Sequence, residues 1–272
     1  MYSNDITQSR LAREGLREYA KHPLLTTVGI DRSYYAPIPD EDLRRYADQL
    51  PEGFLACAKA PAAVTAPTLF DGARRGGQNP DYFSAERLTI DLLEPFARSF
   101  HGHTGPFILE FPPPARDVPV DPHRFVEQLD RLLDAVPNEF EFAVELRSRA
   151  LLTPEYRRVL ARHHAAHVYN YWSFMPVPGE QAAIVPPGDA GFIVVRLLLR
   201  PGARYEDQRE IFRPFNRLVE PDQRMRLDVT QLLKRSLSAG QRAYVLVNNK
   251  AEGSSPLTVR ALAQLMVGTS AP

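Results

Sequence analysis

Short hydrophobic runs alternate along most of this chain with segments whose apolar residues recur at helical spacing. The runs that predict strands cover residues 26–35, 54–60, 107–111, 141–148, 165–172, 192–200 and 243–247. Helical spacing covers residues 9–22, 40–49, 82–100, 121–135, 154–164, 223–238 and 257–266. Most of the strand runs are apolar almost throughout, which is typical of strands that are covered on both faces. The pattern therefore predicts an α/β fold with parallel strands.

The number and order of these runs favour a barrel. Seven predicted strands alternate with helices and end in polar residues, as in a TIM-type (β/α) barrel. An open doubly wound sheet is the alternative, and it is weakened because no glycine-rich phosphate motif follows the first predicted strand. Residues 61–80 form a long connection rich in proline, glycine and polar residues, and residues 174–190 are predicted to form a loop.

Composition leaves the number of domains open and excludes few partners. The 272 residues are 44% hydrophobic, which fits a single barrel domain as well as two smaller domains. Because no Gly/Ser linker marks a boundary, we expect a single barrel domain over residues 1–272. The 33 basic residues balance the 33 acidic ones, so net charge gives no argument for nucleic acid or an anionic membrane. The single cysteine, Cys57, excludes an internal disulfide and fits a reducing compartment. Neither a signal peptide nor a membrane span is predicted, so we expect a soluble cytoplasmic protein without a membrane partner.

Three charged residues at two strand ends are the predicted catalytic groups. Glu145 and Arg147 lie two positions apart, so their side chains point to one face of the strand. Arg147 offers a forked donor for a carboxylate or phosphate, and Glu145 would orient it or transfer a proton. Lys59, which ends another strand, would neutralise an anion or, with a pKa lowered by burial, act as base or nucleophile. The alternatives are an internal ion pair and a solvated lysine.

A polar cluster separates the last strand from the last helix. It contains the predicted substrate-binding residues Asn248, Asn249, Lys250, Ser254 and Ser255. Barrels often bind phosphate in the loops after their last strands, where backbone N–H groups and a helix N-terminus converge. Ser255 is the predicted N-cap, with Pro256 at the first helical position. The alternative is a capping network that only holds the last helix.

Four more polar residues on other strands complete the predicted binding site: Asp31, Glu110, Asn170 and Arg196. The sequence requires no cofactor, although Asp31, Glu110 and Glu145 would supply oxygen ligands for Mg²⁺ or Mn²⁺ if they converge. The aromatic residues 169–176 would stack a ring or a base over the barrel mouth, or pack beneath a loop.

Two functions from different classes fit these residues. The first is an enzyme that binds a small anionic substrate, phosphorylated or sugar-like, and acts by acid–base chemistry. The second is a nucleic-acid-binding or processing protein. The balanced net charge argues against this function. A local basic stripe of Arg74, Arg75, Arg200 and Arg204 would nevertheless suffice to bind a phosphate backbone. The oligomeric state is left open.

Five motifs follow one another along the chain in the order in which they occur in a known family. They lie at residues 19–20 with 27–37, 54–59, 105–113, 142–148 and 247–256, within a similarity that covers residues 11–267. On these motifs the chain resembles the YecE-like family, domain of unknown function 72. The resemblance implies a TIM barrel and leaves the activity open.

The chain departs from the family pattern at several positions. Family members open with a strand before the first helix, whereas here the chain starts with that helix, so either its start is truncated or a strand has been lost. Gly29 and Asp31 replace the usual glutamate and asparagine. Residues 149–152 lack the expected aromatic, and residues 196–199 lack a histidine. These departures add a third hypothesis, a degenerate copy that binds without catalysing.

Overall fold

Seven parallel strands form the main sheet of this protein. A computed structural model describes residues 8–71, 74–113, 120–188 and 190–268. The strands are β1 (Thr27–Ile30), β2 (Leu55–Lys59), β5 (Thr104–Phe111), β6 (Phe142–Leu146), β7 (Ala166–Tyr171), β8 (Phe192–Leu197) and β9 (Arg242–Val247). Their order in the sheet follows the order in the chain, with β1 and β9 at its two ends. This order, with helices between the strands, confirms the predicted α/β fold of the TIM-barrel type with seven strands.

The chain divides into two compact units, residues 1–107 with 136–141 and residues 108–135 with 142–272. The prediction of a single domain stays a prediction. Helices and short strands of the first unit are α1 (Gln8–Ala20), η1 (Arg32–Tyr34), α2 (Asp40–Ala47), α3 (Ala62–Thr65), β3 (Thr68–Asp71), β4 (Arg74–Gln78), α4 (Ala85–Leu88), η2 (Thr89–Leu93), α5 (Glu94–Ser99) and η3 (His101–His103). Strand β5 begins in this unit and ends in the next.

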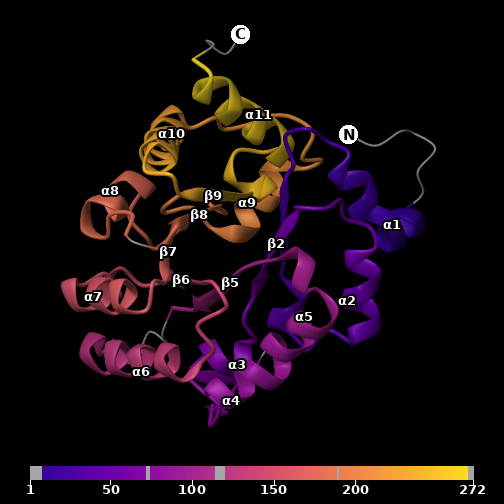
Figure 1. Ribbon diagram of the computed structural model, residues 1–272. Coiled ribbons are helices and arrows are strands. Elements are labelled where there is room, and N and C mark those ends of the chain that lie inside the picture. Colours follow the sequence, from indigo (N-terminus) through magenta and orange to yellow (C-terminus); the bar gives the residue numbers. More distant parts are fainter. Residues whose placement is uncertain (1–7, 72–73, 114–119, 189, 269–272) are drawn as a thin grey trace. The chain divides into compact units, whose positions relative to one another are not determined.

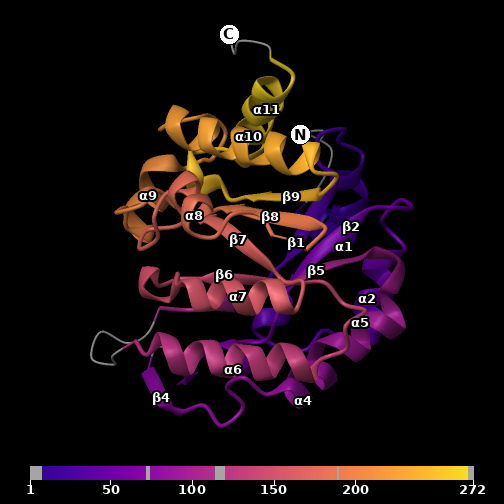
Figure 2. The same cartoon turned by 60° about the vertical axis from the view of Figure 1, so that its left-hand side comes forward.

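The second unit contains β6 to β9 and the helices that cover them. The helices are α6 (Pro122–Ala135), η4 (Arg149–Leu151), α7 (Pro154–Arg162), α8 (Pro178–Ile184), α9 (Tyr205–Phe212), α10 (Gln223–Ser238), η5 (Asn249–Ala251) and α11 (Ser255–Met266). Figures 1 and 2 show α6, α7 and α8 in succession on the outer side of β6 and β7. Helix α10 packs against β8 and β9 and beside α8 and α11.

Burial on both faces explains why these strands are apolar runs. All six residues of β8 are buried, and so are all six of β7. On the helix side, Ile193, Val195 and Leu197 belong to a core cluster with Val229 and Leu233 of α10. Since hydrophobic burial stabilises the fold by about 25 cal/mol per Å² of apolar surface, this layer holds the second unit together.

The structure corrects several predicted boundaries. The strand predicted over residues 26–35 ends at Ile30, because the Tyr34 N–H donates to Asp31 O and closes a 3₁₀ turn. The helix predicted over residues 82–100 is divided by a π-helical segment, and the connection 61–80 contains a short helix and the β3–β4 hairpin. The loop predicted over residues 174–190 contains α8. Thr153 is the N-cap of α7, and its side chain accepts from Tyr156 N at 3.2 Å.

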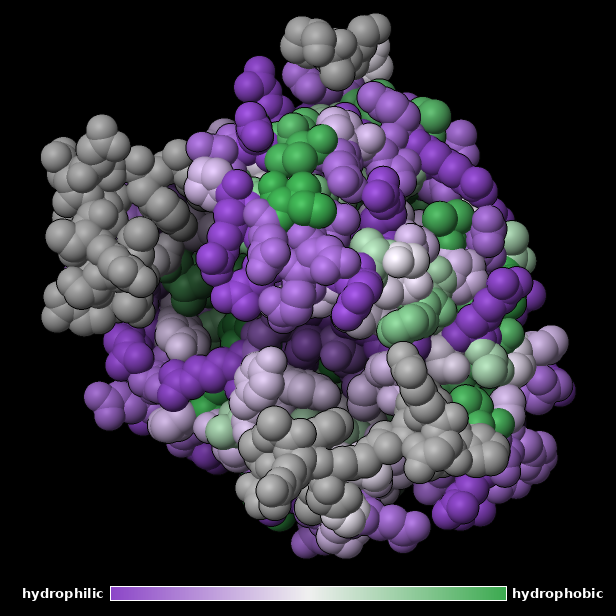
Figure 3. All heavy atoms as spheres, turned by 180° about the vertical axis from the view of Figure 1, so that it is seen from behind, coloured by the Kyte–Doolittle hydropathy of each residue, from purple (hydrophilic) through white to green (hydrophobic). Residues whose placement is uncertain are grey.

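The surface and helix lengths add one observation each. On the face shown in Figure 3, hydrophilic residues predominate and hydrophobic ones form small separate patches, which is ordinary for a protein surface. Among the described helices, none has both the length and the apolar character that crossing a membrane requires.

Candidate functional site

Two glutamates and two arginines form a buried charged cluster in the second unit. Arg147 Nη2 donates to Glu110 Oε2 at 2.7 Å and lies 2.8 Å from Glu145 Oε1. Arg196 Nη1 donates to the same Glu110 oxygen at 2.9 Å and also to Glu145 Oε2. Asn170 Nδ2 joins them at 3.3 Å from Glu145 Oε1. We call these five residues the charged cluster.

The strands position the cluster at their carboxyl ends. Glu110 is the second-last residue of β5 and Arg196 the second-last of β8, while Arg147 directly follows β6. Glu145 and Arg147 contact each other, which confirms that their side chains lie on one side of the strand. Successive parallel strands present equivalent positions side by side, so residues far apart in the chain meet here.

The charged groups of the cluster are buried and therefore have to be paired with one another. Glu145 is 0% exposed and Arg147 5% exposed, so neither charge is solvated by water. Buried charges are stable only when they are paired and hydrogen-bonded, and the cluster balances two carboxylates against two guanidinium groups. The internal ion pair expected by the alternative interpretation is therefore present.

Arg147 also stacks against the only tryptophan of the chain. The guanidinium carbon lies 4.1 Å from the ring centroid of Trp172, just beyond the end of β7. Arg147 Nε and Trp172 Nε1 are both buried N–H donors without a hydrogen-bond partner in the part of the chain that the structure describes. Buried donors are rarely left unpaired, so this stacked pair has two donors to offer a ligand.

A second layer of polar residues holds Asn170 in place. Gln181 Nε2 of α8 donates to Asn170 O at 2.6 Å, and Gln181 Oε1 accepts from Asn170 N at 3.2 Å. His167 Nε2 donates to Gln181 Oε1 at 3.1 Å, and His167 Nδ1 therefore accepts from Tyr156 OH at 2.9 Å. Sequence reasoning missed Gln181 because it placed that segment in a loop.

His167 is neutral in this arrangement. Burial lowers the pKa of His167 from 6.5 to about 4, although its hydrogen bond to Gln181 acts in the opposite direction. Protonation would also place a second N–H against the hydroxyl of Tyr156, whose own pKa burial raises well above its usual value. His167 in its uncharged form therefore helps to hold Gln181, and through Gln181 also Asn170, in place.

Two predicted site residues meet in the first unit. Lys59 Nζ lies 3.8 Å from Asp31 Oδ1 and 4.7 Å from the ring centroid of Tyr34. Ser33 Oγ donates to Lys59 O at 2.7 Å and fixes the turn after β1 to the end of β2. One carboxylate and one aromatic ring thus lie beside the lysine ammonium group, and its predicted catalytic role stays a prediction.

The residues after β9 mostly cap one another. Asn248 Oδ1 accepts from Lys250 N at 3.0 Å and Lys250 Nζ at 3.2 Å, and Asn249 Oδ1 accepts from Ser255 N at 2.7 Å. The prediction of Ser255 as N-cap is wrong by one residue, because α11 begins at Ser255 and Ser254 is the N-cap. These bonds match the capping network of the alternative interpretation. Binding by this loop stays a prediction.

A buried ion pair that the sequence did not predict holds this loop against α10. Arg226 Nε donates to Glu252 Oε1 at 2.9 Å, and Arg226 Nη2 donates to Glu252 Oε2 at 3.0 Å. Glu252 Oε1 also accepts from Asp222 N at 2.7 Å. Such two-point pairing fixes geometry as well as charge, so Glu252 has a structural role.

The described residues add no support for the metal and nucleic-acid interpretations. Among the described residues, no group of three or more histidine, cysteine, aspartate or glutamate side chains is placed to hold a metal ion. Arg200 pairs with Glu220 at 2.9 Å rather than standing in a basic stripe. The side chains of Arg74 and Arg75 lie outside what the structure describes, and nucleic-acid binding stays a prediction.

Comparison with known proteins identifies relatives. A family model described as "Protein of unknown function DUF72" matches residues 3–271. A DUF72 family protein (EF0366) from Enterococcus faecalis V583 has a similar crystal structure, with a TM-score of 0.67, 18% identity and 94% of each chain covered. Another (TM1631), from Thermotoga maritima MSB8, gives 0.64 and 16%, covering 98% of this chain and 92% of that one. No curated protein matches the chain. The structural likeness supports the fold alone.

Proposed function

This chain belongs to the DUF72 family of proteins of unknown function, and we propose that it binds a small anionic substrate at the carboxyl ends of β5 to β8 and acts on it by acid–base chemistry. The observation that carries the proposal is the pair of buried donors without a partner among the described residues, Arg147 Nε and Trp172 Nε1. A buried donor without a partner costs about 1–3 kcal/mol. Oxygens of a carboxylate or phosphate would satisfy both donors.

The charge and shape of Arg147 favour an anion. Arginine offers five N–H donors in a planar fork that matches carboxylate and phosphate oxygens. Glu110 and Glu145 both bind through Nη2 of Arg147, which leaves the Nε–H of the guanidinium for a ligand. The Trp172 ring holds the guanidinium plane in one orientation, so little side-chain freedom is lost on binding.

We assign proton transfer to Glu110 and a positioning role to Glu145. The Glu110 side chain is 12% exposed, whereas that of Glu145 is 0% exposed and accepts from Arg147, Arg196 and Asn170. A ligand reaches a partly exposed carboxylate more easily than an enclosed one. Glu145 then orients both arginines.

We expect inorganic phosphate, and acetate as a carboxylate probe, to bind and change the fluorescence of Trp172, the only tryptophan. Arg147→Lys and Trp172→Phe should each weaken phosphate binding about tenfold or more, since a charge-assisted hydrogen bond contributes about 1.5–3 kcal/mol. Titration calorimetry measures the affinity of both variants, because Trp172→Phe removes the fluorescence signal.

Arg149→Lys is the matched control, because Arg149 lies two residues further on and is exposed. Its affinity for phosphate should equal that of the unmodified protein. Thermal melts of each variant establish that it is folded before its affinity is compared. Undiminished binding by folded Arg147→Lys and Trp172→Phe would remove Arg147 and Trp172 from the site.

Glu110→Gln should raise the affinity for phosphate about tenfold. Glu110 Oε2 accepts from both Arg147 and Arg196, so removing its charge frees donors of both arginines and lessens repulsion of an anion. The exposed variant Glu139→Gln serves as control for the loss of one negative charge. Weaker phosphate binding by Glu110→Gln would mean that the glutamate itself takes part in holding the anion.

A further inference from the structure

A pocket lies in the second unit, between the loop that follows β8 and helix α9. Its volume is about 650 Å³, within the usual size of small-molecule sites. It is lined by Arg200, Pro201, Gly202, Ala203, Arg204, Asp207, Gln208, Ile211 and Glu220. None of these nine residues belongs to the charged cluster. The pocket is therefore a candidate binding site in its own right.

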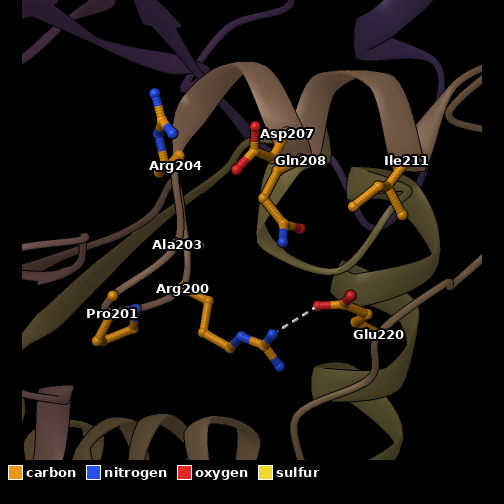
Figure 4. A pocket seen from close by; sticks show the side chains of 9 residues that line it. Arg200, Pro201, Ala203, Arg204, Asp207, Gln208, Ile211 and Glu220 are labelled. Atoms are coloured by element: carbon orange, nitrogen blue, oxygen red, sulfur yellow. Dashed lines mark ion pairs between the residues drawn. The ribbon is translucent and has the colours of Figure 1, made fainter.

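One side chain of this pocket, that of Gln208, carries a buried hydrogen-bond acceptor. Gln208 is 6% exposed, and its Oε1 is a buried acceptor without a hydrogen-bond partner among the described residues. Figure 4 shows the Gln208 amide pointing into the space between Arg200, Ile211 and Glu220. An acceptor that is buried and unpaired within a pocket calls for a ligand that donates a hydrogen bond.

The surrounding charges balance. Arg200 Nη2 lies 2.9 Å from Glu220 Oε2 and forms one side of the pocket, while Arg204 and Asp207 add one further charge of each sign. An anion would be repelled by the carboxylates and would leave the Gln208 acceptor unpaired. A cation would be repelled by the arginines. Hydroxyl groups match the arrangement, because each one donates to an acceptor and accepts from a guanidinium N–H.

The backbone of the pocket is held in place and one wall is apolar. Gly202 N donates to Ser173 O at 2.9 Å, and Ala203 O accepts from Ser173 Oγ at 2.7 Å. Ile211, on the same helix as Gln208, presents an aliphatic surface that the C–H face of a sugar ring would cover. From these contacts we infer that the pocket binds an uncharged polyhydroxyl molecule of monosaccharide size, with Gln208 as the acceptor for one hydroxyl.

Titration of the full chain with glucose and with ribose, followed by ¹H–¹⁵N NMR, tests this inference. Saturable shifts confined to residues 200–211 and their neighbours are expected, with a dissociation constant on the order of 1 mM for a ligand of this size. Gln208→Leu should weaken binding at least about tenfold, since the acceptor is lost. Gln231→Leu, at an exposed position of α10, should bind as the unmodified protein does.

Ligand-free Gln208→Leu should melt at the same temperature or higher, because an apolar side chain replaces a buried acceptor that has no partner. A lower melting temperature would show that Gln208 is structural and would overturn the inference. So would the absence of saturable shifts with both sugars, unchanged affinity in Gln208→Leu, or shifts of residues 200–211 that inorganic phosphate produces and the sugars do not.

Discussion

Replacing Glu145 by alanine should destabilise the protein by about 3–5 kcal/mol. The change leaves Arg147 and Arg196 buried with Glu110 as the one remaining carboxylate of the cluster, and breaking a buried ion pair from one side typically costs this much. Glu145→Gln should cost less, because an amide oxygen still accepts from one arginine. Urea unfolding at neutral pH measures the difference in the free energy of unfolding.

Two comparisons separate loss of charge pairing from loss of volume. The exposed Glu139→Ala should change stability by no more than about 0.5 kcal/mol. The double variant Glu145→Leu with Arg196→Met removes one charge of each sign and leaves Glu110 paired with Arg147, so it should recover much of the loss. If Glu145→Ala were as stable as the unmodified protein, the cluster would not be the paired, water-free arrangement described above.

Lowering the pH should destabilise the protein through His167. The pKa of His167 is about 4 in the folded chain and 6.5 ordinarily, so between these values the unfolded chain binds the extra proton. Stability from the neutral imidazole is therefore fully present above pH 6.5 and is lost as the pH falls toward 4. A shift of this size corresponds to about 3 kcal/mol in total, of which about 2 kcal/mol is lost between pH 7 and pH 5.

His167→Gln isolates this contribution from that of the carboxylates, which also titrate in acid. Urea unfolding of both proteins at pH 7, 6 and 5 should show a smaller loss of stability in the variant, with the difference close to the expected about 2 kcal/mol. His123→Gln, at an exposed position of α6, should follow the unmodified protein. Parallel pH profiles for His167→Gln and the unmodified protein would mean that His167 is not buried in its neutral form.

The sequence by itself determined the order of the seven strands of the main sheet and the fold class. Helix α10 was predicted with its bounds, because amphipathic spacing is a local signal. The side chains of Glu145 and Arg147 were predicted to lie on the same side of their strand, because side chains in a strand alternate with a period of two residues. Periodicity sufficed for these features because it depends on neighbours a few residues away.

Only the tertiary structure decided which polar residues pair. Arg196 and Glu110 are 86 residues apart in the chain, and the register of parallel strands brings them together. Gln181, in a segment without a strong period, became part of the site because α8 packs against β7. The asparagines after β9 cap their own turn, and Glu252 pairs with Arg226 of α10. Partner choice depends on long-range packing, which no local spacing encodes.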